Sequence, residues 1–143
     1  MEPIIEALKR GIVPIVFGDI ILDEKLGCCI FSGEVTLDNL SWELQKRKFE
    51  IRKIIQAGTT DGVYDKKGKV ISRITQKNFE TIKEALSGAN GTDVTGGMLH
   101  KVEESLRMAK RGIEVWIING LTKDNLYRAI VSRPQAGTEI VYD

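Results

Sequence analysis

Residues 93–101 read DVTGGMLHK, a stretch in which two glycines open an amphipathic helix and a lysine follows one turn inside it. Adjacent glycines let an anion approach the backbone closely, and the first N–H groups of a helix have no partner within that helix. The helix dipole adds partial positive charge at this end, and Lys101 adds a full charge. The pattern is typical of a phosphate site, although a flexible loop before a surface helix has the same appearance.

Helical and extended patterns alternate on both sides of this stretch. Apolar spacing predicts helices over 3–10, 35–47, 78–86, 96–111 and 123–131, strands over 12–17, 50–57, 114–118 and 139–142, and a hairpin over 20–31. The run 12–17 is apolar enough for a strand buried on both faces, and Pro14 indicates that this strand lies near an edge or begins after it. We therefore expect an α/β three-layer sandwich with a mostly parallel sheet, and a single domain over residues 1–143.

Composition excludes several classes of protein. The chain has 143 residues, of which 42% are hydrophobic and 29% are charged, as in ordinary globular domains. A net charge of +1 gives no electrostatic case for nucleic acid as a partner, and the basic run 46–48 is interpreted as a solvated helix end. The sequence has no signal-peptide pattern at residues 1–6 and no apolar run of membrane-spanning length, so we expect no membrane partner and a cytoplasmic protein.

The cysteines and the histidine do not form a metal-binding pattern. Cys28 and Cys29 are neighbours, so their side chains point to opposite faces of a strand, and we expect two reduced core thiols. The sequence has one histidine, His100, and no cysteine and histidine spacing that would hold a metal ion. We expect no metal held by the protein's own side chains, and we interpret His100 as a surface residue of a helix.

Four short polar loops come just after predicted strands or just before predicted helices. They are Ser32–Gly33, Thr59–Asp61, Thr95–Gly97 and Asn119–Gly120. Each one alone is compatible with a turn or a helix cap. Ligands of α/β proteins gather at the carboxyl ends of strands, so four such loops on one edge predict a shared binding rim.

Five motifs in this order resemble the amino acid kinase superfamily, and within it the carboxyl-terminal half of archaeal-type isopentenyl phosphate kinases. The motifs are residues 11–19 with 32–34, residues 60–65, residues 93–98 with Lys101 and Val102, residues 117–120, and Gly137–Thr138. The resemblance implies an α/β sandwich that transfers the γ-phosphoryl group of ATP, with Mg²⁺, to a terminal phosphate or carboxylate. It also implies that the nucleotide phosphates are the main ligands of the Mg²⁺.

The resemblance also implies roles for particular residues. Those that would border the nucleotide or its phosphates are Thr59, Thr60, Asp61, Gly96, Gly97 and Lys101. Lys101 would also be catalytic, because it would neutralise charge on the β- and γ-phosphates. Those that would lie beside the acceptor phosphate are Ser32, Gly33 and Glu34. Tyr64 is interpreted as a packing residue rather than a ligand.

The sequence departs from the family pattern at three points. Family members carry an early Gly-Gly-Ser loop with a lysine and a second glycine-rich segment with a histidine, and this sequence has none of these. Glu34 stands where the family usually has Asp, and Thr59 stands where an acidic or amide residue is customary. We therefore expect the chain to supply the nucleotide-binding half of an isopentenyl phosphate kinase and to be incomplete and inactive alone.

Two other functions fit the same residues. The chain could be a non-catalytic nucleotide-binding module or one half of a split kinase. It could also belong to a kinase that acts on an acylglutamate, glutamate, a nucleoside monophosphate or a phosphonate. In each case we expect an exposed apolar edge that is covered by a homo-oligomer or by a missing amino-terminal half.

Overall fold

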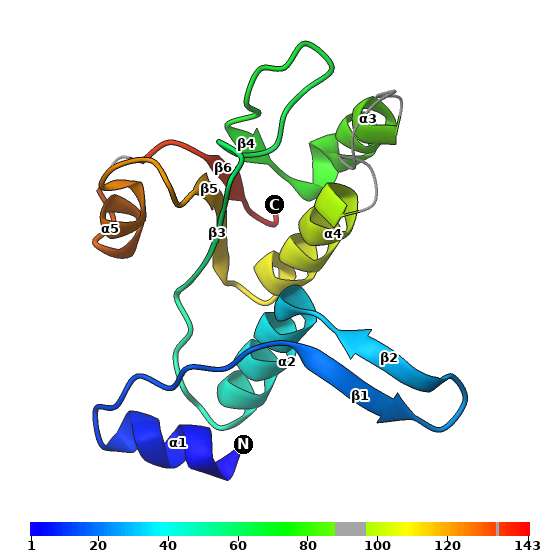
Figure 1. The fold of residues 1–143 in the computed structure, drawn as a ribbon. Coiled ribbons are helices and arrows are strands. Elements are labelled where there is room, and N and C mark those ends of the chain that lie inside the picture. The colour runs from blue at the N-terminus through cyan, green and yellow to red at the C-terminus, as the bar shows by residue number, and fades with distance from the viewer. Residues whose placement is uncertain (88–96, 134) are drawn as a thin grey trace. The chain divides into compact units, whose positions relative to one another are not determined.

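The computed structural model describes residues 1–87, 97–133 and 135–143 of the chain (Figure 1). The chain forms two compact units, unit 1 over Met1–Glu50 and unit 2 over Ile51–Asp143. Each unit has its own helices and its own sheet, and each is described by itself below.

Unit 1 consists of two helices and a hairpin. Helix α1 spans Glu2–Lys9, strands β1 and β2 span Asp19–Asp23 and Gly27–Phe31, and helix α2 spans Gly33–Lys46. The hairpin turns where the Asp23 carboxylate accepts bonds from the backbone N–H groups of Lys25 and Leu26, at 2.9 and 2.8 Å. The basic run 46–48 is exposed at the end of α2, which confirms the prediction of a solvated helix end.

The predicted strand over residues 12–17 is wrong for this structure. The segment forms no strand, and Val13, Ile15 and Phe17 are 82%, 92% and 80% exposed. A strand buried on both faces needs a neighbouring strand on at least one side, and in the described residues β1 pairs with β2 while the other strands belong to unit 2. The run 12–17 is therefore apolar, but it pairs with no strand among the described residues.

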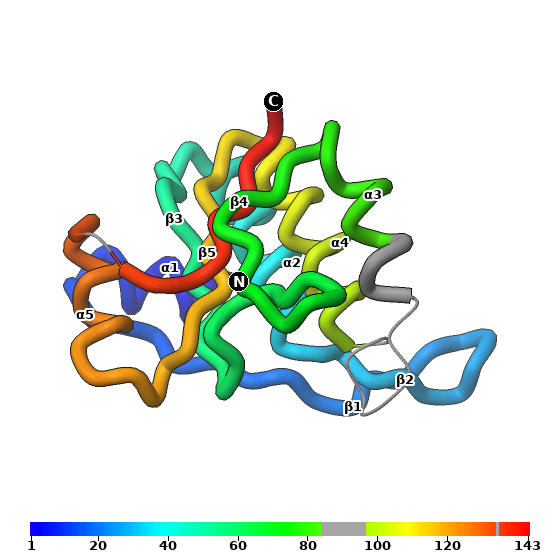
Figure 2. Tube along the Cα trace, turned by 90° about the horizontal axis from the view of Figure 1, so that it is seen from above, coloured from blue at the N-terminus to red at the C-terminus, as the bar shows by residue number. Residues whose placement is uncertain are grey.

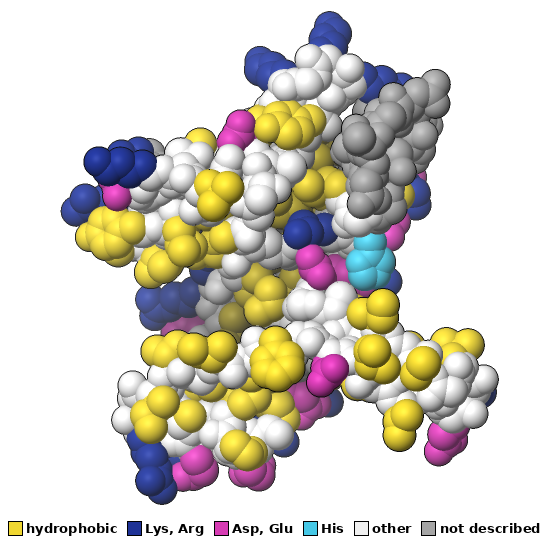
Figure 3. All heavy atoms as spheres, in the orientation of Figure 1, with side chains coloured by type: hydrophobic (Ala, Val, Ile, Leu, Met, Phe, Trp, Pro, Cys, Tyr) yellow, Lys and Arg dark blue, Asp and Glu magenta, His cyan; other side chains and the backbone are white. Residues whose placement is uncertain are grey.

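The prediction of two core thiols is also wrong. Both cysteines are free and lie on β2, but Cys28 is exposed and Cys29 is only partly buried. Ile20, Leu22 and Ile30 lie on one face of the hairpin and are exposed, and Ile21 on the other face is 41% exposed, so neither face is packed into a core. Hydrophobic side chains accordingly gather on the hairpin surface (Figure 3).

Unit 2 is built on a four-stranded sheet with the order β3-β5-β6-β4. The strands span Lys53–Gly58 (β3), Arg73–Ile74 (β4), Glu114–Asn119 (β5) and Thr138–Ile140 (β6). β3 runs parallel to β5 and β4 parallel to β6, whereas β5 and β6 are antiparallel. The mostly parallel sheet is confirmed. The two-residue strand β4 was not predicted, because so short a segment has no recognisable periodicity.

Helices cover both faces of this sheet, as the two views in Figures 1 and 2 agree. Helices α3 (Gln76–Ser87) and α4 (Gly97–Lys110) lie on one side, and α5 (Asn125–Ile130) lies on the other. Side chains along a strand point alternately to the two faces of the sheet. On β3, Gln56 therefore contacts α4 on one face, while Lys53 on the other face donates to the Ala129 carbonyl of α5. This arrangement confirms the predicted three-layer α/β sandwich, and the prediction of a single domain over 1–143 stays a prediction.

The core of unit 2 lies between the sheet and its helices. Its fully buried side chains come mainly from α4, β5 and β6, and they include Val102, Met108, Val115, Ile118 and Ile140. The spacing of Val102, Leu106 and Ala109 places one apolar face of α4 on the sheet, as the sequence pattern predicted.

A tight turn over residues 65–69 follows Tyr64 in unit 2. One Asp65 carboxylate oxygen accepts bonds from the N–H groups of Lys67 and Lys69, at 2.8 and 2.9 Å. The Lys69 N–H is the largest cause that holds the pKa of Asp65 below its ordinary value of 3.8, burial opposes it by a smaller amount, and the Lys67 N–H lowers the pKa further. Gly68 adopts a positive φ of 74°, which completes the turn.

We expect this turn to loosen below pH 3.8, the ordinary pKa of an Asp carboxyl. Because the pKa of the folded Asp65 lies below its ordinary value, the turn is stabilised at higher pH, and this stabilisation is lost as the pH falls through the lowered pKa. In an NMR titration, the amide shifts of Lys67 and Lys69 should change with a midpoint below 3.8. A midpoint above that value would show that the carboxylate does not hold these amides in solution.

Candidate functional site

The carboxyl ends of β3 and β5 form one edge of the unit 2 sheet. Gly58 and Asn119 are the last paired residues of these parallel strands, and the Gly120 N–H donates to the Gly58 carbonyl at 2.9 Å. The strands approach so closely here that a Cβ added to Gly120 would lie 3.1 Å from the Cβ of Ala57. The loops after Gly58 and after Asn119 therefore begin side by side, as the sequence predicted for two of its four loops.

Asp61 is the best-positioned polar side chain of this edge. Its two carboxylate oxygens accept bonds from the Asn119 side-chain amide at 2.8 Å and from the Tyr64 hydroxyl at 3.2 Å. Asp61 itself is exposed, so the two bonds orient the carboxylate without removing it from solvent. Tyr64 was interpreted as a packing residue, and its hydroxyl has the additional role of holding Asp61.

Two buried polar side chains connect the loops behind this edge. Asn125 is 3% exposed, and its amide bonds the Asn119 carbonyl at 3.1 Å and both backbone groups of Ala136 at 3.0 Å. Thr138 is fully buried, and its hydroxyl accepts from the Val63 N–H at 2.8 Å and donates to the Ile71 carbonyl at 2.7 Å. These bonds fix the loops that carry Asp61, Tyr64 and Asn119.

Sequence reasoning missed Asn125 and quoted Thr138 only as part of a motif. A signal for Asn125 was present, since it is an amide in the first turn of the predicted helix over 123–131, where Asn favours local bonds to backbone. The long-range bond from Val63 to Thr138 had no such signal, because the residues are 75 positions apart.

The remaining nucleotide-side candidates lie on the loop after β3 and at the start of α4. Thr59 is exposed and Thr60 is partly buried in the loop that follows Gly58. Gly97 is the first residue of α4 and is exposed, and a Cβ added there would meet no atom within 4 Å. Gly96 and the rest of the stretch 93–96 lie outside the described residues.

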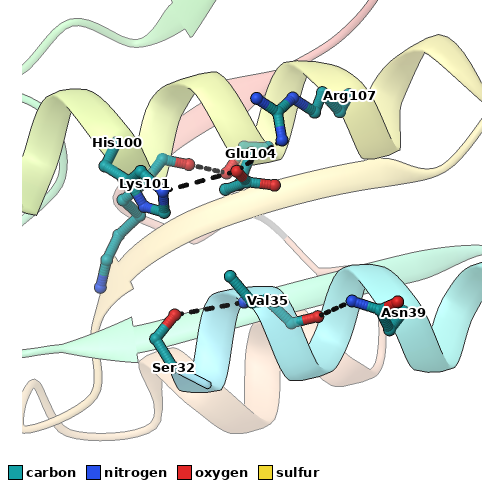
Figure 4. Close-up of polar contacts among 8 residues, drawn as sticks. Ser32, Val35, Asn39, His100, Lys101, Glu104 and Arg107 are labelled. Atoms are coloured by element: carbon teal, nitrogen blue, oxygen red, sulfur yellow. Dashed lines mark hydrogen bonds and ion pairs between the residues drawn. The ribbon is translucent and has the colours of Figure 1, made fainter. Parts of the chain in front are cut away.

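Lys101 lies one turn inside α4 and is partly buried. Its side chain runs away from the neighbouring Glu104, whose carboxylate accepts from Arg107 at 2.7 Å and lies 3.5 Å from His100 Nε2 (Figure 4). The Glu104 side chain is 5% exposed, and the Arg107 guanidinium on the same helix compensates its charge. His100 is 53% exposed, which confirms its interpretation as a surface residue of a helix.

The predicted acceptor residues lie at the start of α2 in unit 1. Ser32 is the N-cap, and its hydroxyl accepts from the Val35 N–H at 3.3 Å (Figure 4). Gly33 is the first helical residue and is exposed, while Glu34 lies in the first turn, where a carboxylate interacts favourably with the helix dipole. The segment is therefore a well-formed helix start, and its contact with an acceptor phosphate stays a prediction.

The described residues contain neither a metal-binding cluster nor a membrane-spanning helix. Within residues 1–87, 97–133 and 135–143, no group of three or more His, Cys, Asp or Glu side chains is placed to hold a metal ion. In the same part of the chain, no helix combines the length and the apolar character needed to cross a bilayer.

The layered fold and the polar edge define an α/β protein of the kind that binds ligands at the carboxyl ends of its strands. The amino acid kinase family matches residues 1–119 of the sequence, and the chain belongs to this family. The resemblance inferred from the motifs is therefore confirmed.

Curated relatives and a solved structure give the same assignment. The chain is 39% identical to isopentenyl phosphate kinase of Methanocaldococcus jannaschii, covering 94% of this chain and 48% of the relative. It is 33% identical to isopentenyl phosphate kinase of Methanothermobacter thermautotrophicus, covering 93% and 50%. A crystal structure of an isopentenyl phosphate kinase superposes with a TM-score of 0.71 at 27% identity, over 96% of this chain and 49% of that one. The chain spans about half the length of the curated relatives that it matches.

Proposed function

We propose that this chain supplies the nucleotide-binding side of a kinase that transfers the γ-phosphoryl group of ATP to isopentenyl phosphate. The observation that carries the proposal is the oriented Asp61 carboxylate at the edge of a family-typical sheet, on the same unit as the glycine start of α4 and Lys101. The names of the relatives support the acceptor, and the family supports the reaction class.

The described residues fit a nucleotide in chemical terms. The exposed Asp61 carboxylate is a hydrogen-bond acceptor that suits a nucleotide hydroxyl, and Thr59 and Thr60 offer hydroxyl groups beside it. The open space at Gly97 leaves room for a phosphate at the start of a 14-residue helix. Gly96 would complete this approach, and Lys101 would neutralise the charge that develops during phosphoryl transfer.

Mg²⁺ would be held mainly by the nucleotide phosphates. The described residues contain no carboxylate cluster that could form a metal cage, whereas Mg²⁺ commonly keeps several waters and binds substrate phosphates. When bound, the ion would supply charge neutralisation between the β- and γ-phosphates. The work of the protein is then to place the nucleotide and the lysine.

The acceptor side of the proposed enzyme involves unit 1 and a partner. The start of α2, with Ser32, Gly33 and Glu34, offers backbone N–H groups and a helix dipole to an acceptor phosphate. The family's glycine-rich segment and histidine are not in this sequence, so we propose that an amino-terminal half or a second copy covers the exposed run 12–17. Free cysteines fit a reducing compartment, and we place the protein in the cytoplasm.

Calorimetry and reconstitution test this proposal together. The isolated chain should bind MgATP weakly, and adding the half of the Methanocaldococcus jannaschii relative that the chain does not match should produce phosphoryl transfer to isopentenyl phosphate. If the chain binds MgATP but the mixture stays inactive, the non-catalytic module is the better description. An absence of MgATP binding would remove the nucleotide assignment itself.

A further inference from the structure

A buried hydrogen-bond relay joins β3 to α4 in unit 2. The Gln56 side-chain amide donates to the Ser105 hydroxyl at 2.9 Å, and this hydroxyl donates to the Lys101 carbonyl at 2.6 Å. Ser105 is fully buried and Gln56 is 7% exposed, so water does not compete for these bonds. The relay thus connects a strand of the sheet to the backbone of the lysine that we place in the site.

The relay lies between the two parts of the proposed nucleotide site, which are the loop that begins at Thr59 and the turn of α4 that carries Lys101. Gln56 precedes the loop that begins at Thr59 by three residues, and Ser105 follows Lys101 by one helical turn. Ser105 and Lys101 lie on the same helix, so any sliding of α4 along β3 would move Lys101 by the same distance relative to that loop. A bond between Gln56 and Ser105 opposes such sliding.

The Gln56 side chain also lowers the stability that this part of the core could have. The Gln56 Oε1 atom is buried and has no hydrogen-bond partner among the residues that the structure describes. A buried acceptor without a partner costs free energy, and an apolar side chain of similar shape would avoid that cost. Residues that break the ordinary rules of core packing are concentrated at functional sites.

We propose that Gln56 and Ser105 are positioning residues that hold Lys101 in register with the Thr59–Asp61 loop for the β- and γ-phosphates of ATP. The proposal rests on the proposed function, because it assigns Lys101 to those phosphates. Gln56 and Ser105 touch no substrate and act only through the placement of α4.

Affinities for MgATP and AMP, measured by calorimetry on the full chain, separate positioning from simple destabilisation. Gln56→Met should weaken MgATP binding by about fivefold to tenfold, since misplacing one charged contact costs on the order of 1 kcal/mol. AMP affinity should stay within about twofold, because AMP has no β- or γ-phosphate for Lys101 to contact. Ser105→Ala provides a second removal of the same relay.

Two further variants sharpen the test. In Lys101→Ala, adding Gln56→Met should cause no additional loss of MgATP affinity, because the two changes act on one interaction. Asn78→Ala is the matched control. It removes the side-chain bonds that Asn78 accepts from the Thr75 N–H and donates to the Arg73 carbonyl, at the opposite edge of the sheet, so it should lower the melting temperature without changing the ratio of MgATP to AMP affinity.

The outcomes distinguish a failure of the positioning role from a failure of the proposed nucleotide-binding function. Suppose that the wild-type chain binds MgATP, and that the ratio of MgATP affinity to AMP affinity is unchanged in both Gln56→Met and Ser105→Ala. This result overturns the positioning role and leaves the nucleotide site in place. Equal losses for both nucleotides in both variants also overturn it, since they indicate general disruption. If the wild-type chain does not bind MgATP, the proposed function fails and the positioning role fails with it.

Discussion

Lys101→Ala is expected to weaken MgATP binding by about tenfold to a hundredfold, which corresponds to the loss of a charge-assisted contact of roughly 1.5–3 kcal/mol. In the reconstituted enzyme, phosphoryl transfer should fall by about a thousandfold, because the ammonium group would stabilise charge that grows during the reaction. Calorimetry with MgATP and a coupled assay of transfer measure the two effects.

The same helix supplies the control for this prediction. Lys110 is the last residue of α4, and its ammonium lies 5.7 Å from the centre of the Tyr142 ring. Lys110→Ala removes an equal charge at the far end of the helix, so MgATP affinity should stay within about twofold. Equal affinities of wild-type and Lys101→Ala chains would remove the lysine from the site, while equal losses in both lysine variants would indicate only a general charge effect.

Thr138→Val is expected to destabilise the protein strongly, although the two side chains have the same shape. The valine has the shape of threonine, but it leaves the Val63 N–H and the Ile71 carbonyl without their shared hydroxyl. Both bonds are made by a fully buried residue, so we expect a loss of about 2–4 kcal/mol in the free energy of unfolding. Urea denaturation followed by circular dichroism measures this loss.

Thr138→Ser separates the hydroxyl from the methyl group. Serine keeps both hydrogen bonds and removes one buried methyl, which costs about 1 kcal/mol. The valine variant should therefore be the less stable of the two, although it fills the space better. The reverse order would show that packing, and not the hydroxyl, holds the loop after β3 to β6.

The helices and the central strands could be predicted because local patterns specify them. The apolar face of α4 repeats at helical spacing through Val102, Leu106 and Ala109, and β5 contains a continuous apolar run over 115–118. The segment 12–17 carries the same kind of pattern and forms no strand. The difference lies outside the segment, since a strand exists only where another strand accepts and donates its backbone bonds.

The sequence predicts which residues lie at the candidate site, but it predicts only some of the contacts among them. Asp61, Asn119 and Gly120 follow strands in the sequence, and parallel pairing of β3 with β5 then places them together. The role of Tyr64 was missed, because a tyrosine in a loop has the same local pattern whether its hydroxyl bonds a carboxylate or faces solvent. Its bond to Asp61 depends on the conformation of the loop between them.

The sequence by itself determined the family, the alternation of strands and helices, and the residues that we propose for phosphate binding, because these depend on local spacing and side-chain chemistry. Only the tertiary structure decided that Asn125 and Thr138 tie the loops together, that Gln56 bonds Ser105, and that the run 12–17 is exposed. Hydrogen bonds and burial join residues far apart in the chain, so they exist only after the strands have paired and the helices have packed.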